Sequence, residues 1–192
     1  MTKKERKALQ RYLLKFDEIN RLNATIVQLI ESSADVKEAE QIFDDLLIDA
    51  YIEGFSAVGF LLDSDDDAID KFKLEAAKDK EYDGESIQDK LRKYYEDDDT
   101  DGIKTLIDSE FHRMYGQGGY DNASQIDRPI FKRWMTVGDD KVRDTHDFLD
   151  GTTAPLDGYF HSYDGDYGLA PGMFQTADNN ANCRCWLTYY YG

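Results

Sequence analysis

Apolar residues recur every three or four positions along the first stretch of the chain. They fall at Leu9, Leu13, Phe16, Ile19, Leu22, Ile26 and Leu29. Side chains at this spacing lie on one face of a helix and come close to the seam of a heptad repeat. The pattern therefore predicts an amphipathic helix whose apolar face serves as a core or as a docking surface for another protein.

A second helical pattern follows Ser32 and Ser33, either of which can cap a helix. The expected apolar face consists of Val36, Ala39, Phe43, Leu46, Ala50 and Ala57. Together the two segments predict a long helical hairpin. The acidic run over 63–67 then interrupts the pattern, because its charges repel one another.

Shorter helices are expected after this acidic run. Two are predicted over 67–80 and 86–96, joined through the turn pair Asp83-Gly84. A further helix is predicted over 103–115, with Ile103, Leu106, Ile107 and Phe111 facing inward.

The pattern changes again after the glycine-rich segment 116–119. A strand is predicted over 130–136, and a second, rich in aromatic residues, over 184–191. Between them, Asp139 or Asp140 can cap a short helix carrying Val142, His146 and Leu149 on one face, and Gly151 can end it.

The predicted fold class is α+β, with a long N-terminal helical arm over 1–101 and a small mixed α/β core over 102–192. The two strands of the core can share one sheet.

The charge balance narrows the classes of partner. The chain has 40 acidic residues against 23 basic ones, a net charge of −17. Such a field repels phosphate backbones and anionic lipids, so neither direct nucleic-acid binding nor membrane binding is expected. The sequence contains no long apolar run, and its first residues lack the apolar stretch of a signal peptide. Two cysteines cannot build a disulfide framework, which favours a reducing compartment.

The last third of the chain carries separated motif residues in a fixed order. They are Trp134-x-Thr136, Asp140-x-x-Arg143-x-x-His146, Leu149-Asp150-Gly151, Pro155-Leu156, Phe160, Pro171-Gly172 and Asn182-Cys183-Arg184-Cys185. This order and spacing resemble the phage head morphogenesis family, the minor capsid proteins similar to protein F of phage Mu. The segment 110–122 is weakly similar to the helix that precedes this core in the family.

The resemblance implies a structural protein of the virion, made in the host cytoplasm and placed inside the head near the portal. It implies a role in capsid assembly or in DNA packaging and ejection, with the portal protein or the major capsid protein as partner. Self-association through the helical arm is a further expectation.

The resemblance also implies a core similar in shape to ADP-ribosyltransferases. An ADP-ribosyltransferase-like enzyme, using His146 and nearby acids, is therefore an alternative function. Such an enzyme needs an acidic pair of the Glu-x-Glu kind, and the chain's one example, Glu38-Ala-Glu40, lies in the predicted hairpin. Fold alone does not imply function, so the expectation is a protein without enzymatic activity.

His146, Cys183 and Cys185 leave three interpretations open. The imidazole can bridge the short helix and the terminal strand by hydrogen bonds. It can join both thiols and an aspartate in a zinc site, although Cys-x-Cys is closer than the usual zinc spacing. It can also act as a base beside a cysteine nucleophile, with Asp150 as its orienting carboxylate. The structural interpretation is preferred, and Arg184 is expected on the opposite face, holding a carboxylate or carbonyls or exposed to solvent.

A second candidate metal site is a calcium loop. Asp97, Asp99, Asp101 and Asp108 occupy positions 1, 3, 5 and 12 of such a loop, with Gly102 at position 6. Position 12 is normally a glutamate, and the alternative is an acidic turn in which Asp101 caps the next helix. A calcium-dependent adaptor, whose loop switches the geometry of the arm, is thus a third possible function.

Overall fold

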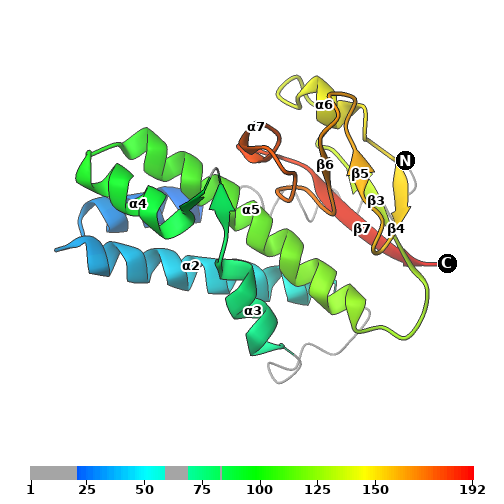
Figure 1. Ribbon diagram of the computed structural model, residues 1–192, viewed down its shortest axis with the longest axis horizontal. Coiled ribbons are helices and arrows are strands. Elements are labelled where there is room, and N and C mark those ends of the chain that lie inside the picture. The colour runs from blue at the N-terminus through cyan, green and yellow to red at the C-terminus, as the bar shows by residue number, and fades with distance from the viewer. Residues whose placement is uncertain (1–20, 59–68, 83) are drawn as a thin grey trace.

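The computed structural model describes residues 21–58, 69–82 and 84–192 of the chain. Helices form one side of the molecule, and short strands, loops and two short helices form the other, with the long helix α5 (Thr100–Ser124) between them (Figure 1). The α+β class and the helical N-terminal region are confirmed. The predicted apolar positions Leu9, Leu13, Phe16 and Ile19, together with the acidic run over 63–67, lie outside the described residues.

The predicted helical hairpin is present in the described part of the chain. Residues 21–31 are helical, and α2 (Val36–Ala57) follows after a short turn. The cap of α2 is Asp35, whose carboxylate accepts hydrogen bonds from two backbone N–H groups of the first turn. The prediction of a serine cap was wrong, because the Ser33 hydroxyl donates to the carbonyl of Ile30 and ends the preceding helix instead.

The buried face of helix 21–31 is shifted by one position along the sequence from the predicted face. Val27 and Ile30 are buried, whereas Leu22 and Leu29 are 44% and 47% exposed. The helix is rotated so that Asn23, also buried, donates a hydrogen bond of 2.7 Å to Asp108 of α5. In α2 the expected face is buried except for Val36, which is half-buried, and Ala57, which is exposed.

The structure corrects the expected end of the helix after residue 115. Helix α5 continues through the glycine-rich segment 116–119 and is 25 residues long. A Cβ on Gly118 would lie 2.0 Å from the carbonyl oxygen of Tyr51, and a Cβ on Gly54 would lie 1.9 Å from that of Tyr115. Glycine usually weakens a helix, but here it allows the backbones of α2 and α5 to come into contact.

The two short helices predicted after the acidic run are present in shortened form. They are α3 (Lys71–Lys78) and α4 (Ile87–Glu96). The turn between them carries a two-residue antiparallel ladder of β1 (Glu81–Tyr82) and β2 (Glu85–Ser86), with Gly84 at positive φ. Ser86 caps α4 by accepting from the backbone of Asp89.

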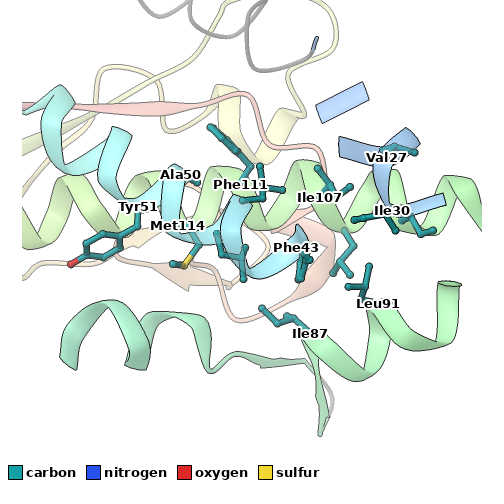
Figure 2. Packing of buried hydrophobic residues seen from close by; sticks show 14 of the residues in the cluster. Val27, Ile30, Phe43, Ala50, Tyr51, Ile87, Leu91, Ile107, Phe111 and Met114 are labelled. Carbon is teal, nitrogen blue, oxygen red and sulfur yellow. The ribbon is translucent and has the colours of Figure 1, made fainter. Parts of the chain in front are cut away.

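The main hydrophobic core lies among the helices. Side chains from helix 21–31, α2, α4 and α5 meet there, as Figure 2 shows for a selection that includes Phe43, Leu91 and Ile107. Helix α5, which begins at Thr100, therefore shares its core with the helices that precede it. The division of the chain into domains at residues 101 and 102 stays a prediction.

The predicted strands are both present and are neighbours in one sheet. Strand β3 (Ile130–Met135) lies between β4 (Thr153–Pro155) and β7 (Trp186–Tyr191), antiparallel to both. A separate ladder joins β5 (Phe160–His161) to β6 (Tyr167–Gly168). The predicted short helix is α6 (Asp144–Asp147), and a second one-turn helix, α7 (Ala177–Asn180), precedes β7.

Candidate functional site

The motif residues of the last third converge on a small buried cluster around Trp134. Its ring lies edge-on to those of His146, Phe160 and Phe174, at centroid distances of 5.3, 5.2 and 5.6 Å. The alternation of strand β3 points Trp134 inward, and α6 presents His146, which is 1% exposed. Cys183 and Cys185 complete this cluster from the segment before β7.

Both thiols contact the same atom of the histidine. The Sγ atoms of Cys183 and Cys185 lie 3.4 and 3.5 Å from Nδ1 of His146. Both cysteines are buried and free of disulfides. The predicted contact between the short helix and the terminal segment is therefore present, and it is made by the cysteines.

The two thiols have opposite tendencies to ionise. A hydrogen bond from Cys185, together with the contact to His146, lowers the pKa of Cys183 despite its burial. The proximity of Cys183, together with burial, raises the pKa of Cys185. A thiolate in this cluster is therefore favoured on Cys183, where two neighbours can donate to it.

Asn182 acts through its backbone. Its φ angle of 52° lies in the left-handed region, which asparagine tolerates better than most residues. The turn at this position brings the following residues, which have no regular strand structure until Trp186, back toward α6. This turn lets the two cysteines of Cys-x-Cys reach the same imidazole nitrogen.

The sequence of the whole region matches a known family. The family described as Phage Mu protein F like protein matches residues 78–188, more than half of the chain. The chain belongs to this family of phage head morphogenesis proteins.

Two curated relatives are similar over shorter stretches. The Minor head protein GP7 of Bacillus phage SPP1 is 35% identical over 83 residues, which are 42% of this chain and 27% of that protein. The NAD(+)--arginine ADP-ribosyltransferase EFV of Enterococcus faecalis is 36% identical over 69 residues, which are 36% of this chain and 14% of that protein. The alignments thus span less than a third of either relative. No solved structure matches the chain significantly.

The remaining polar residues of the family motif bind backbone groups. The carboxylate of Asp150 accepts hydrogen bonds from the backbone N–H and the hydroxyl of Thr136, at 2.8 and 3.2 Å. Gly151 follows at a positive φ of 75° and closes the turn between α6 and β4. Arg143 donates to the carbonyls of Asn179 and Ala181. These contacts tie α6 to β3 and α7.

Arg184 holds a carboxylate, which is one of the roles expected of it. It forms a salt bridge with Asp139. Asp139 also accepts a hydrogen bond from the backbone of Lys141 and so stabilises the turn before α6. The predicted cap of α6 was wrong, because this helix begins later, with Arg143 at its N-cap.

The structure does not bring the four aspartates of the predicted calcium loop together. Asp97 ends α4, and the side chain of Asp99 caps α5 by accepting from the backbone of Gly102 at 2.9 Å. Asp101 lies in the first turn of α5, and Asp108 lies further along it, bound to Asn23. A calcium loop wraps its ligands at positions 1, 3 and 5 around one ion and turns sharply at the glycine of position 6, whereas here Asp101 and Gly102 already lie in the first turn of a helix.

The acidic pair required by the enzyme interpretation has structural partners. Glu38 accepts from the backbone of Ala34 at the start of α2. Glu40 forms a salt bridge with Arg92 of α4. Both lie on the helical side of the molecule, and α6 lies on the other side (Figure 1).

Two buried polar features of this fold were not expected from the sequence. The Asp166 carboxylate accepts from the backbone of Tyr167, Gln175 and Thr176 and from the Asn179 amide, and so holds the loop before α7. Lys132 is fully buried in β3 and donates to the carbonyl of Leu169 at 2.8 Å. Burial lowers its pKa to about 8. The signal was available, because residues 130, 132 and 134 share one face of the predicted strand.

A small cavity of about 110 Å³ lies between α4, α5 and α7. It is lined in part by Glu110, which is buried, accepts from Tyr82 and forms an ion pair with Arg113 at 2.6 Å. Small-molecule sites usually have volumes of about 300–1,000 Å³, so this cavity is smaller than most.

None of the described helices is long and apolar enough to cross a membrane.

Proposed function

We propose that this chain is a structural protein of a phage head. The observation that carries the proposal is the match to the Phage Mu protein F like family over residues 78–188, with the Minor head protein GP7 among its relatives. In this function the protein is part of the virion, inside the head, and acts in capsid assembly or in DNA packaging and ejection near the portal.

The burial and the contacts of the motif residues support a structural function. His146 and both cysteines are at most 3% exposed, so a macromolecular substrate does not reach them. The charged side chains of Arg143 and Asp150 form hydrogen bonds with backbone groups of the same chain. The residues that carry the family resemblance thus hold together the fold between β3 and β7.

The composition of purified virions tests the function directly. The protein is expected in washed, DNA-filled heads at a small, fixed ratio to the portal protein, measured by quantitative mass spectrometry. Its deletion is expected to reduce the yield of infectious particles. Absence from mature heads and from their assembly intermediates contradicts the proposal.

A docking surface is offered by helix 21–31. Leu22 and Leu29 are exposed on this helix, and burial of such side chains in an interface is favourable. We infer that they contact the portal protein or the major capsid protein, or the same surface of a second copy.

Charge substitution tests this surface. The double variant Leu22→Asp/Leu29→Asp is expected to lose co-purification with portal or capsid, or self-association, while its melting temperature changes little. Gln28→Asp, an exposed position on the same helix, is the control for added charge. Binding by the double variant equal to that of Gln28→Asp removes this surface from the proposal.

An enzymatic function is the second candidate, and the similarity to the Enterococcus faecalis ADP-ribosyltransferase is the observation in its favour. Transfer of labelled ADP-ribose from NAD⁺ to protein or to a free arginine analogue is the assay. Label transfer that is lost in a folded His146→Ala variant but kept in Glu38→Ala/Glu40→Ala supports an enzyme. Absence of transfer by the full chain argues for the structural function alone.

A further inference from the structure

The His146, Cys183 and Cys185 side chains form a set of donors that ordinary packing does not require. The ligand atoms of all three lie within 4.8 Å of one another, and all three residues are buried. Among the described residues this is the one group of three or more histidine, cysteine or acidic side chains so arranged. Thiolate and imidazole are the ligands preferred by zinc.

We propose that the protein binds one Zn²⁺ ion through Nδ1 of His146 and the Sγ atoms of Cys183 and Cys185. The inference is independent of the function in the phage head. It assigns a metal to residues that the head protein otherwise uses only for packing.

The distances agree with those of a zinc site. Bonds of about 2.3 Å to sulfur and about 2.0–2.1 Å to nitrogen, at a tetrahedral angle, separate the two ligand atoms by about 3.5 Å. The observed separations from Nδ1 are 3.4 Å to Cys183 and 3.5 Å to Cys185. Both separations from Nδ1 therefore match the edge length of a zinc coordination tetrahedron.

The charge balance suits a buried site. Two thiolates cancel the charge of a divalent cation, and the imidazole binds in its neutral form. The resulting complex has no net charge, so its burial avoids the large cost of an isolated buried ion. The described residues supply three ligands, and a water molecule can complete the fourth position.

The close spacing of the two cysteines is compatible with the site because of the local backbone. Residues 183–185 have no regular strand structure, and Asn182 turns the chain at φ 52° just before them. Cys-x-Cys can therefore direct both thiols to one point.

The same distances are allowed for thiol–imidazole hydrogen bonds, so a functional difference must separate the two interpretations. Zinc would link α6 to the segment before β7, around a cluster of only a few buried apolar side chains: Trp134, Leu149, Ala154, Phe160 and Phe174. Small cores gain much of their stability from such a link. A strong chelator should then lower the melting temperature, whereas it has no effect on a hydrogen-bonded cluster.

Elemental analysis of the full chain, purified under reducing conditions from zinc-supplemented medium, is the first test. We expect about one zinc per chain, retained through gel filtration. Cys183→Ser, Cys185→Ser and His146→Ala should each lose most of it. His161→Ala, which changes an exposed histidine outside the cluster, should keep it. A folded wild-type protein that carries no zinc and shows no chelator effect overturns the proposal.

A second measurement on wild-type protein covers the case in which the variants fail to fold. Replacement of the metal by Co²⁺ should give visible d–d bands typical of low coordination number and a sulfur-to-cobalt charge-transfer band in the near ultraviolet. Titration with Zn²⁺ should remove both bands. Spectra of octahedral Co²⁺ without a charge-transfer band place the metal on other residues and refute the site.

Discussion

The contact between α2 and α5 can be tested at a single atom. Gly118→Ala adds one methyl group at a point 2.0 Å from the carbonyl oxygen of Tyr51 and 2.8 Å from the backbone nitrogen of Phe55. Carbon and oxygen atoms need about 3 Å or more, and neither neighbour is a side chain that can rotate away. Helix α2 must therefore shift by about 1 Å along most of its interface with α5.

Two opposing effects set the magnitude. Alanine improves intrinsic helix propensity by about 1 kcal/mol over glycine. Overpacking of a well-packed core costs about 1–3 kcal/mol and occasionally more, and the shift also opens contacts between the largest pair of helices. Because both close neighbours are backbone atoms, we place the overpacking cost at or above the upper end of its range, about 3–4 kcal/mol. The net loss is then about 2–3 kcal/mol, which for a chain of this size lowers the melting temperature by about 4–12 °C.

Thermal unfolding followed by circular dichroism, with urea titration for the free energy, measures this loss. Gly119→Ala is the matched control on the same helix, because its added Cβ meets a side-chain methyl of Val58 at 3.2 Å and no backbone atom closer than 3.5 Å. It should melt close to wild type or above it. If Gly118→Ala is as stable as Gly119→Ala, the two backbones are not in contact and the reasoning is refuted.

Substitutions at three further positions test buried polar groups and a helix cap. Lys132→Met should be more stable than wild type at pH 7. This gain should shrink as the pH rises from about 8 toward 10.5, because over that range unfolded wild-type protein binds more protons than the folded protein and wild type becomes more stable. A pH-independent difference in urea titrations contradicts this. Asp150→Ala should cost about 1–3 kcal/mol in urea unfolding, because it leaves the buried N–H of Thr136 unpaired, and Asp150→Asn should recover part of the loss. Asp99→Ala should cost about 1 kcal/mol with or without millimolar calcium, because Asp99 caps α5; a calcium-dependent melting temperature in wild type that this variant abolishes would restore the calcium loop.

Much of the secondary structure follows from local pattern. The helical spacing of apolar residues in α2 and α4, and the β-rich composition of the strands β3 and β7, are properties of short segments, and the structure has these elements in the expected places. The motif order from Trp134 to Cys185 likewise identified the family from sequence, because several separated elements had to coincide. Local conformational preferences and the spacing of apolar residues can be recognised in the sequence without knowing which surface each segment packs against.

Other features depended on what each segment packs against. The glycines within 116–119, taken alone, indicate the end of a helix. Helix α5 nevertheless continues through them, because α2 packs so closely against it that position 118 has no room for a side chain. The buried face of helix 21–31 carries Val27, Ile30 and Asn23, which is bonded to Asp108 of α5, whereas apolar spacing alone favoured Leu22 and Leu29.

The candidate site shows the same division. The sequence supplied a histidine and two cysteines of the right kind, but because they are nearly forty positions apart, it left metal binding and catalysis open beside the preferred structural interpretation. The left-handed turn at Asn182 and the antiparallel pairing of β3 with β7 bring them together. The four aspartates show the converse, since their spacing matched a calcium loop while the helix that begins at Thr100 holds Asp101 and Asp108 in its own turns. Spacing along the chain fixes which side chains are available, and only the packing of distant segments fixes which of them meet.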